Sequence, residues 1–269
     1  MLRNLALYRR LVGILIRSQV HYRIPFFFDL MGTALITTIG FGSLAMIFGR
    51  FGSIAGWSLG EVAFLYGIAE TSFGLMDMLF SGFDPPNFGR QVRLGLFDQL
   101  LLRPVNITLQ IMGSDFVLRR IGRILQGMVI FGLAVHMTHV HWTLGKLLYL
   151  PLVFASVIAF FGGLFITGAT ITFWTVESIE IINILTYGGT EMMSYPMHIY
   201  QDWLRYFFTY ILPAVFLSYY PALYMLDKPD PFHFPAFAPF LSPIVGFGLL
   251  ALALAFWNFG IRHYQSTGT

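Results

Sequence analysis

Cysteine and charge are what this sequence lacks. None of its 269 residues is a cysteine, which excludes a disulfide framework and a thiolate metal site. Only 11% of the residues are charged, whereas soluble domains carry about 25%. Hydrophobic residues make up 57% of the chain, and the mean hydropathy is +0.71. Such a chain has too little polar surface for a water-soluble globule, so we expect one all-α domain, residues 1–269, embedded in a membrane.

Sequence motifs for catalysis and nucleotide binding are also missing. The chain contains no G-x-x-x-x-G-K-[ST], the loop whose backbone amides and lysine cradle phosphates. It also contains neither H-E-x-x-H nor G-x-S-x-G. Three classes remain open at this point: a transport subunit, a multipass membrane enzyme that uses Glu70, Asp77 or histidines, and a membrane scaffold.

The first 24 residues have a helical pattern but are not a typical span. Apolar residues recur at helical spacing, while Arg3, Arg10 and Arg17 are seven residues apart and share another face. This pattern predicts an amphipathic helix on the membrane surface. A secretory signal is the alternative, but the arginines interrupt its apolar region and no small-residue cleavage site follows.

Long apolar runs predict about six membrane crossings, each of about 20 residues. One crossing is ambiguous, because either 181–200 spans and 203–226 forms an outer hairpin, or the second stretch spans and the first lies at the interface. We expect the first arrangement, with the outer hairpin at 201–226. The predicted spans are 25–48, 61–83, 121–140, 147–172, 181–200 and 240–261.

Basic residues indicate the orientation. With about six crossings, twelve arginines fall on the side of the N-terminus and four basic residues on the other side. Basic residues gather on the cytoplasmic side of membrane proteins, so both termini are expected in the cytoplasm. The four on the outer side are Arg50, Lys146, Arg205 and Lys228.

The longest connection on the expected cytoplasmic side runs from 84 to 120. Pro85 and Pro86 stop the preceding helix, and Arg103-Pro104 marks another boundary. Between these boundaries we expect one amphipathic helix of about three to four turns that projects from the bundle as a docking element. It carries Arg90, Arg93, Leu96, Phe97 and Asp98.

Two segments resemble a known family of membrane transporters. The run that contains Arg93, Gly95, Phe97-Asp98, Leu101-Leu102 and Arg103-Pro104 resembles the G-x-x-D-x-L-L-x-R-P signature of type-2 ABC exporter permeases, in their six-span bacterial branch. The second match comprises Ser194-Tyr195-Pro196, Ile199-Tyr200, Trp203-Leu204-Arg205, Pro213 and Tyr219-Tyr220-Pro221. With the N-terminal helix, the resemblance covers essentially the whole chain.

The resemblance implies a division of labour. Such a permease binds no cofactor itself, pairs in the bacterial cytoplasmic (inner) membrane with a second copy or a different sister permease, and is driven by separate cytoplasmic ATPase subunits that bind ATP and Mg. No nucleic-acid partner is expected. The helix carrying Arg90, Arg93, Leu96, Phe97 and Asp98 would be the ATPase-coupling element; a capping or salt-bridge role within the loop is the alternative. Tyr195 and Trp203, near the expected outer gate, are substrate-path candidates.

Two acidic residues lie inside the second predicted span. Glu70 falls near the bilayer centre, and Asp77 follows seven residues later on the same helix face. Ionisable groups at that depth usually face a protein interior or an aqueous path. Both are therefore candidates for a path that attracts a cationic substrate, or for structural bonds to Thr, Ser or Arg side chains of neighbouring helices.

Three histidines end the third predicted span. Imidazoles at the spacing of His136, His139 and His141 can share a cation, but no carboxylate or cysteine accompanies them in that short loop. A polar turn at the interface is the preferred interpretation, and no metal site is predicted.

Overall fold

The computed structural model describes residues 2–21, 23–175 and 180–266. Its described residues form helices, turns and one isolated bridge between Ile54 and Trp57. Five helices are long and apolar enough to cross a membrane. They are α2 (Arg23–Phe51), α3 (Leu59–Phe80), α7 (Ile121–Thr138), α8 (Leu144–Thr175) and α13 (Ser242–His263). Each coincides within a few residues with a predicted span.

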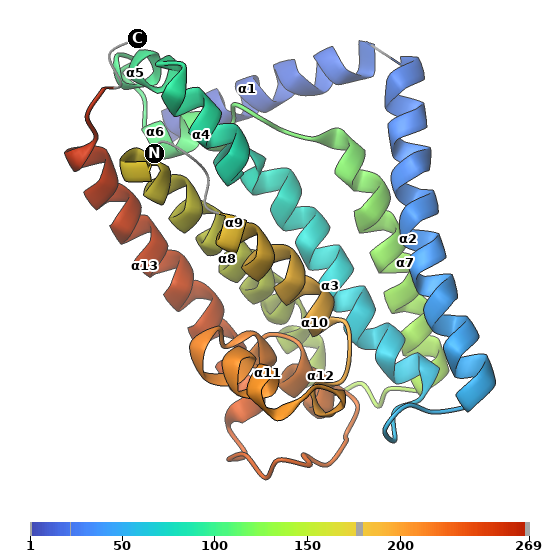
Figure 1. Cartoon of the computed structure of the whole chain (residues 1–269). Helices are drawn as coiled ribbons and strands as arrows, with labels where there is room; N and C mark the ends of the chain where they lie inside the picture. Colours follow the sequence, from blue (N-terminus) through green and yellow to red (C-terminus); the bar gives the residue numbers. More distant parts are fainter. Residues whose placement is uncertain (1, 22, 176–179, 267–269) are drawn as a thin grey trace.

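Helix α3 is the centre of the bundle. It packs against α7 on one side and α8 on the other, and α13 packs against α8 while α2 packs against α7. Figure 1 shows this order across the molecule, with α2 and α13 at the two edges. In the most apolar 18-residue stretch of the span that begins with α3, 83% of the residues are buried within the chain. The corresponding share for α2 is 12%. Most of α2 therefore faces the surroundings of the chain.

Close approach of α3 and α7 depends on glycine. A Cβ atom at Gly67 of α3 would lie 2.7 Å from the Cβ atom of Phe131 and 2.8 Å from its Cα atom. On α7, a Cβ atom at Gly127 would lie 2.7 Å from the backbone nitrogen of Thr71. Small residues let two backbones approach in this way in membrane helix pairs. The same close packing brings polar side chains of α3 and α7 into direct contact.

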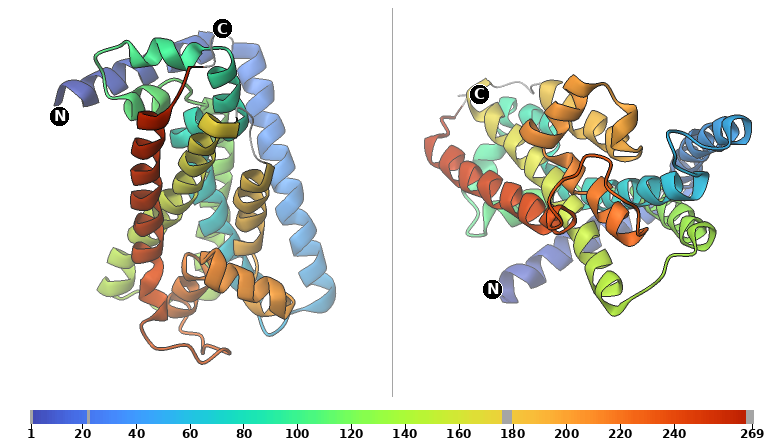
Figure 2. Two further views of the ribbon diagram at one scale, coloured as in Figure 1. Left: turned by 60° about the vertical axis from the view of Figure 1, so that its left-hand side comes forward. Right: turned by 90° about the horizontal axis from the view of Figure 1, so that it is seen from below.

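The two ends of the bundle differ in structure. One end holds both chain termini, the crosswise helix α1 (Leu2–His21) and the short helices α4 (Pro85–Arg93), α5 (Leu96–Leu101) and α6 (Ile107–Met112), as Figures 1 and 2 show. The opposite end holds the α2–α3 and α7–α8 connections together with α11 (Asp202–Tyr206) and α12 (Tyr219–Met225). The segment 84–120 and both termini thus share one end.

The expected fifth span needs correction. Helix α9 (Glu180–Asn183), a π-helical turn (Ile184–Gly188) and α10 (Gly189–Met193) follow one another without interruption, but the helix ends at Met193 and not at Tyr200. It is about 20 Å long, short of the roughly 30 Å hydrocarbon core. Beyond it, Asp202–Ile211 and Ala214–Met225 form a pair bent by 76° that is apolar enough to be a broken span or a re-entrant loop. The described residues thus contain five candidate spans, or up to six.

The expected docking helix also needs correction. Instead of one helix, α4 and α5 meet at Gly95, whose φ of 65° is left-handed. A right-handed helix cannot continue through that conformation, so α5 turns away from α4.

Candidate functional site

An ion pair joins α3 and α7 inside the bundle. Nε of Arg123 lies 2.5 Å from Oε2 of Glu70, and Nη2 of Arg123 lies 2.9 Å from Oε1. The guanidinium also packs over the ring of Phe73, 4.5 Å from its centroid. Arg123 counts among the twelve arginines of the expected cytoplasmic side; it lies in the first turn of α7, and its charge is balanced by Glu70.

A second ion pair lies two turns away on the same two segments. Nε of Arg120 lies 2.7 Å from Oδ2 of Asp77, whose side chain is 5% exposed. Each acidic residue predicted inside α3 therefore has an arginine counterion, which matches the structural alternative for these residues. Their part in a substrate path stays a prediction.

Sequence reasoning missed a third carboxylate near the first pair. Glu191 lies on α10, which packs against α3, and it follows by one turn Tyr187, whose ring lies 5.4 Å from that of Phe73. Among the described residues, none forms an ion pair with its carboxylate or donates a hydrogen bond to it. The signal that could have found it is the same one that found Glu70, an ionisable residue within an otherwise apolar stretch.

Two tyrosines complete this neighbourhood. Tyr66 of α3 is buried, and Tyr195, one turn beyond Glu191, is half-buried. Tyr66 lies one turn before Glu70 on α3, and its ring lies 5.7 Å from that of Phe41 in α2. Tyr195 was a predicted site residue; it follows α10 and its part in a substrate path stays a prediction.

Trp203, the other aromatic candidate, is part of the end of the bundle. Its side chain is 66% exposed, and its Nε1 donates a hydrogen bond to Oε1 of Gln201 at 2.9 Å. This placement is typical of a tryptophan at a membrane interface. The substrate role of Trp203 remains a prediction.

The predicted coupling residues separate into exposed and buried groups. Arg90, Arg93 and Leu96 are exposed on α4 and α5. Asp98 is half-buried, and its Oδ2 accepts a hydrogen bond from the hydroxyl of Ser266 at 2.6 Å. Phe97 needs correction, because its ring is fully buried and is not available to a partner surface.

Phe97 belongs to an aromatic cluster that connects α4 and α5 with the long helices. Its ring lies 5.6 Å from that of Phe88 in α4, 5.0 Å from Phe173 in α8 and 6.2 Å from Trp257 in α13, measured between centroids. The ring of Tyr264, which follows α13, lies 4.9 Å from it. The exposed residues of α4 and α5 thus lie on short helices that pack closely against α8 and α13 through this aromatic cluster.

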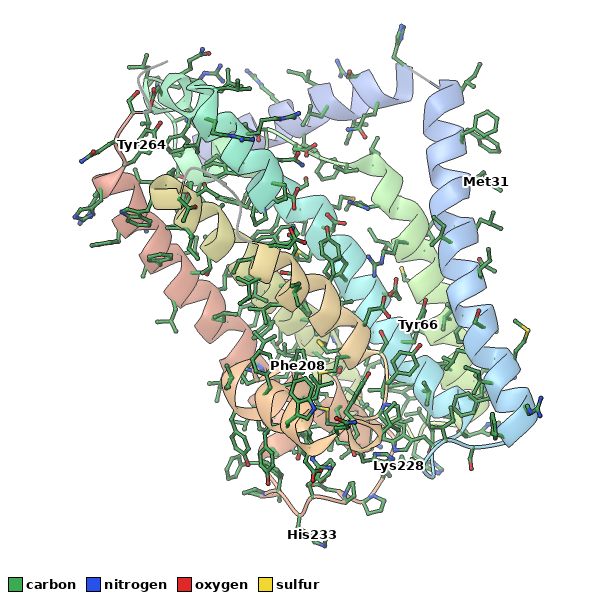
Figure 3. All side chains as sticks on the ribbon, viewed as in Figure 1. Met31, Tyr66, Phe208, Lys228, His233 and Tyr264 are labelled. Atoms are coloured by element: carbon green, nitrogen blue, oxygen red, sulfur yellow. The ribbon has the colours of Figure 1, made fainter. Side chains whose placement is uncertain are left out.

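Contacts at the opposite end join the α2–α3 connection to the α11–α12 region. Nζ of Lys228, labelled in Figure 3, lies 2.7 Å from Oε1 of Glu61 and 4.9 Å from the ring centroid of Trp57. The ring of Trp57 stacks on Tyr219 at 5.7 Å. The ring of His198 hydrogen-bonds to the carbonyl oxygen of Ala55 at 2.7 Å. These contacts close this end around the α11–α12 region.

The described structure shows no metal-binding arrangement of the histidines at the end of α7. The rings of His136 and His139 are 6.2 Å apart between centroids. Across the described part of the chain, no group of three or more histidine, aspartate or glutamate side chains is arranged to hold a metal ion.

Comparison with known proteins gives one match. The family model described as "ABC-2 family transporter protein" matches residues 34–268, nearly the whole chain. No curated protein and no solved structure matches the chain. The matched range contains four of the five long helices, the part of α2 from residue 34 onward, both ion pairs and the exposed residues of α4 and α5. The chain therefore belongs to the ABC-2 family of transporter membrane proteins, and the family match confirms the resemblance found in the sequence.

Proposed function

We propose that the chain is the permease subunit of an ATP-driven exporter in the bacterial cytoplasmic membrane, with separate ATPase subunits bound to α4 and α5. The observation that carries the proposal is the surface of these two helices. It combines exposed arginines with exposed leucines, and it rests on the aromatic cluster that contacts α8 and α13. The exposed leucines are Leu94 (61%), Leu96 (42%), Leu101 (37%) and Leu102 (86%).

A force applied to this surface has a direct route into the bundle. Phe97 is closely packed, so α5 cannot move without displacing Phe173 of α8 or Trp257 of α13. Helices α8 and α13 pack along each other. Movement of the ATPase subunits would thus be transmitted to helices that cross the membrane.

Charge placement supports a cytoplasmic position for this end of the bundle. Exposed arginines at this end include Arg10, Arg17, Arg90, Arg93 and Arg103. Arg120 and Arg123 add little to the excess of positive charge at this end, because Asp77 and Glu70 balance their charges. The remaining arginines still favour the cytoplasmic side.

The position of Glu191 supports pairing with a second permease. Its side chain is exposed in the single chain although α10 packs against the membrane helix α3. A carboxylate facing lipid at that depth is costly. We infer that the α10 face borders a water-filled path shared with a second permease, either a copy of this chain or a related one.

Copurification with an ABC-type ATPase tests the coupling surface. The purified chain alone is expected to hydrolyse no ATP and to retain a co-expressed ATPase on affinity purification. Leu96→Asp and Leu102→Asp should each remove most of the bound ATPase, because each places a charge in the apolar part of the surface. The control is Leu144→Asp, a 72%-exposed leucine at the opposite end. Full retention in both test variants would refute the assignment.

Labelling of single cysteines tests the orientation. The native chain has no cysteine, so Gln265→Cys and Ser53→Cys each introduce one unique thiol. Gln265 lies at the proposed cytoplasmic end and Ser53 in the α2–α3 connection, and both are exposed. In intact cells, a membrane-impermeant maleimide should label only the Ser53→Cys variant. Labelling of Gln265→Cys alone would reverse the orientation.

A further inference from the structure

A cavity of about 220 Å³ lies in the α11–α12 region, at the end of the bundle opposite the chain termini (Figure 1). Residues of α11, of the π-helical turn Phe207–Ile211 and of α12 line it, together with Phe232 and Phe234 of the loop that follows α12. Among the described residues, its lining includes one arginine, Arg205, and no aspartate or glutamate. The cavity therefore has a positively charged group in a largely aromatic lining.

Arg205 keeps hydrogen-bond donors for a ligand. Its Nη2 lies 2.5 Å from Oδ1 of Asp202, whose side chain is 78% exposed, and its guanidinium packs over the ring of Phe232, 4.7 Å from the centroid. Nε and Nη1 of Arg205 form no hydrogen bond with any described residue. A guanidinium presents such donors in a flat fork that matches the oxygen atoms of a phosphate.

Tyr220 of α12 adds a buried hydroxyl to the same cavity. The residue is 1% exposed, and its ring stacks on that of Phe216 at 5.2 Å and lies 5.3 Å from that of Phe234. Within the part of the chain that the structure describes, its hydroxyl has no hydrogen-bond partner. A buried hydroxyl without a partner lowers stability, and an acceptor bound in the cavity would satisfy it.

The loop that carries the two phenylalanines is fixed by Asp230. The two oxygen atoms of its carboxylate accept hydrogen bonds from the backbone N–H groups of Phe232 at 2.9 Å and Phe234 at 2.7 Å. Figure 3 shows His233, which lies between these two residues, at the tip of the loop. Asp230 is thus engaged within the loop and is not one of the residues that line the cavity.

The side chains around the cavity are typical of the headgroup layer of a membrane. The rings of Tyr206 and Tyr210 stack at 5.9 Å and are 59% and 65% exposed. Trp203 of the same helix is 66% exposed, and Ile211 is 73% exposed. Exposed tyrosine and tryptophan side chains gather at the membrane–water interface, where lipid phosphates lie. A phosphate at this level is part of a phospholipid, whose acyl chains can lie along the exposed apolar side chains.

We propose that the cavity binds the phosphate group of a phospholipid through Arg205 and Tyr220, with the glycerol part of the lipid against Phe232 and Phe234. Arg205 belongs to α11 and Tyr220 to α12, so the bound phosphate bridges the two arms of the bent pair Asp202–Ile211 and Ala214–Met225. This lipid site goes beyond the proposed function. In the orientation proposed above, its lipid belongs to the outer leaflet.

Three probes test the phosphate requirement on the purified full-length chain in detergent. They are dioleoylphosphatidic acid, dioleoylglycerol, which has the same acyl chains but no phosphate, and inorganic phosphate. Native mass spectrometry measures the fraction of the chain that carries each probe. Saturable binding of the phosphatidic acid is expected, with each of the other two probes bound at least about tenfold more weakly. Equal binding of dioleoylglycerol overturns the phosphate site, and equal binding of inorganic phosphate overturns the lipid as its source.

Tyr220→Phe removes one hydroxyl and keeps the ring. Because that hydroxyl has no described protein partner, the variant should unfold at the temperature of the native chain or slightly above it. It should nevertheless bind dioleoylphosphatidic acid about three- to tenfold more weakly. The matched control is Tyr200→Phe, which removes a hydroxyl that donates to the carbonyl oxygen of Met192 at 3.4 Å, outside the cavity. Native affinity in Tyr220→Phe overturns the assignment of its hydroxyl to the phosphate.

Arg205→Gln removes the charge and should weaken binding of dioleoylphosphatidic acid about tenfold or more. Arg50→Gln removes an exposed charge at the same end of the bundle and controls for general attraction of an anionic lipid. An equal loss of affinity in the two variants overturns the site. If Arg205→Gln does not fold, Tyr220→Phe decides.

The lipid site and the proposed function are tested separately. Tyr220→Phe leaves α4 and α5 unchanged, so it should copurify with the ATPase as the native chain does. Normal ATPase binding by a native chain that binds no phosphatidic acid would overturn the lipid site alone. Phosphatidic acid binding by a native chain that retains no ATPase would instead overturn the permease assignment alone.

Discussion

Arg123 holds both carboxylate oxygens of Glu70, at 2.5 and 2.9 Å, across the interface between α3 and α7. The Glu70 side chain is 5% exposed and that of Arg123 is 16% exposed. Removing one partner from such a pair leaves an uncompensated charge in the membrane interior. Breaking a buried pair in this way costs about 3–5 kcal/mol.

Arg123→Met should therefore unfold at a markedly lower temperature than the native chain in detergent. The double variant Glu70→Leu with Arg123→Met should recover most of the loss, because it removes both charges and keeps apolar volume. Thermal unfolding followed by size-exclusion chromatography measures both. Arg120→Met is the comparison; it removes a side chain that is 27% exposed and leaves the 5%-exposed Asp77, so it should also lower the unfolding temperature. If the double variant is as unstable as Arg123→Met, the pair does more than balance charge.

The seam between α3 and α7 should tolerate no side chain at its closest point. In Gly67→Ala, the added Cβ atom would meet the backbone of Phe131 at 2.8 Å, so the two helices must separate. Overpacking of this kind costs about 1–3 kcal/mol. Gly132→Ala, on α7 with no atom within 4 Å of the added carbon, should be neutral or slightly stabilising. The unfolding temperature of Gly67→Ala should therefore lie clearly below that of Gly132→Ala. Equal unfolding temperatures would contradict the close approach of α3 and α7 at Gly67.

Neighbouring residues of α5 should respond differently to truncation. Phe97→Ala removes a fully buried ring from the aromatic cluster and should cost about 3–5 kcal/mol. Leu96→Ala removes a side chain that is 42% exposed and should cost far less. In the copurification assay Leu96→Ala should stay folded and retain less of the co-expressed ATPase. Phe97→Ala should lose the ATPase because the variant itself unfolds. Comparable stability of the two would show that the cluster contributes little.

The long spans could be predicted because a bilayer imposes a length and a composition on them. The predicted ends of the segment 121–140 differ from those of α7 by no more than two residues, and the others by a few. The short elements obey no such rule. The helix expected over 181–200 ends at Met193, where Ser194, Tyr195 and Pro196 interrupt it, and hydropathy alone does not mark that break.

Site residues were predictable only where one residue was unusual by itself. Glu70 and Asp77 stood out as charges in an apolar run, but their partners did not, because Arg123 lies 53 residues from Glu70 in the sequence. Arg123 was therefore counted only among the basic residues of the cytoplasmic side. Phe97 was assigned to a surface because it lies on the expected docking helix, whereas the break at Gly95 rotates α5 so that the ring faces Trp257.

Gly95 sets the direction of α5, and this makes it the most sensitive single position of the proposed coupling surface. Its φ of 65° costs a residue with a Cβ atom about 1–2 kcal/mol, and a β-branched residue more. Gly95→Val should relieve that strain by continuing α4 as a helix, which would draw Phe97 out of the aromatic cluster. We expect lower thermal stability and weaker retention of the ATPase.

Two further variants separate the backbone conformation from the change of side chain. Gly95→Asn should keep most of the ATPase, because asparagine adopts the left-handed conformation more readily than other residues do. Gly13→Ala in α1, where the added carbon has no neighbour within 4 Å, should behave as the native chain. Because valine adopts the left-handed conformation far less readily than asparagine, equal ATPase retention by Gly95→Val and Gly95→Asn would show that the turn between α4 and α5 does not orient the coupling surface.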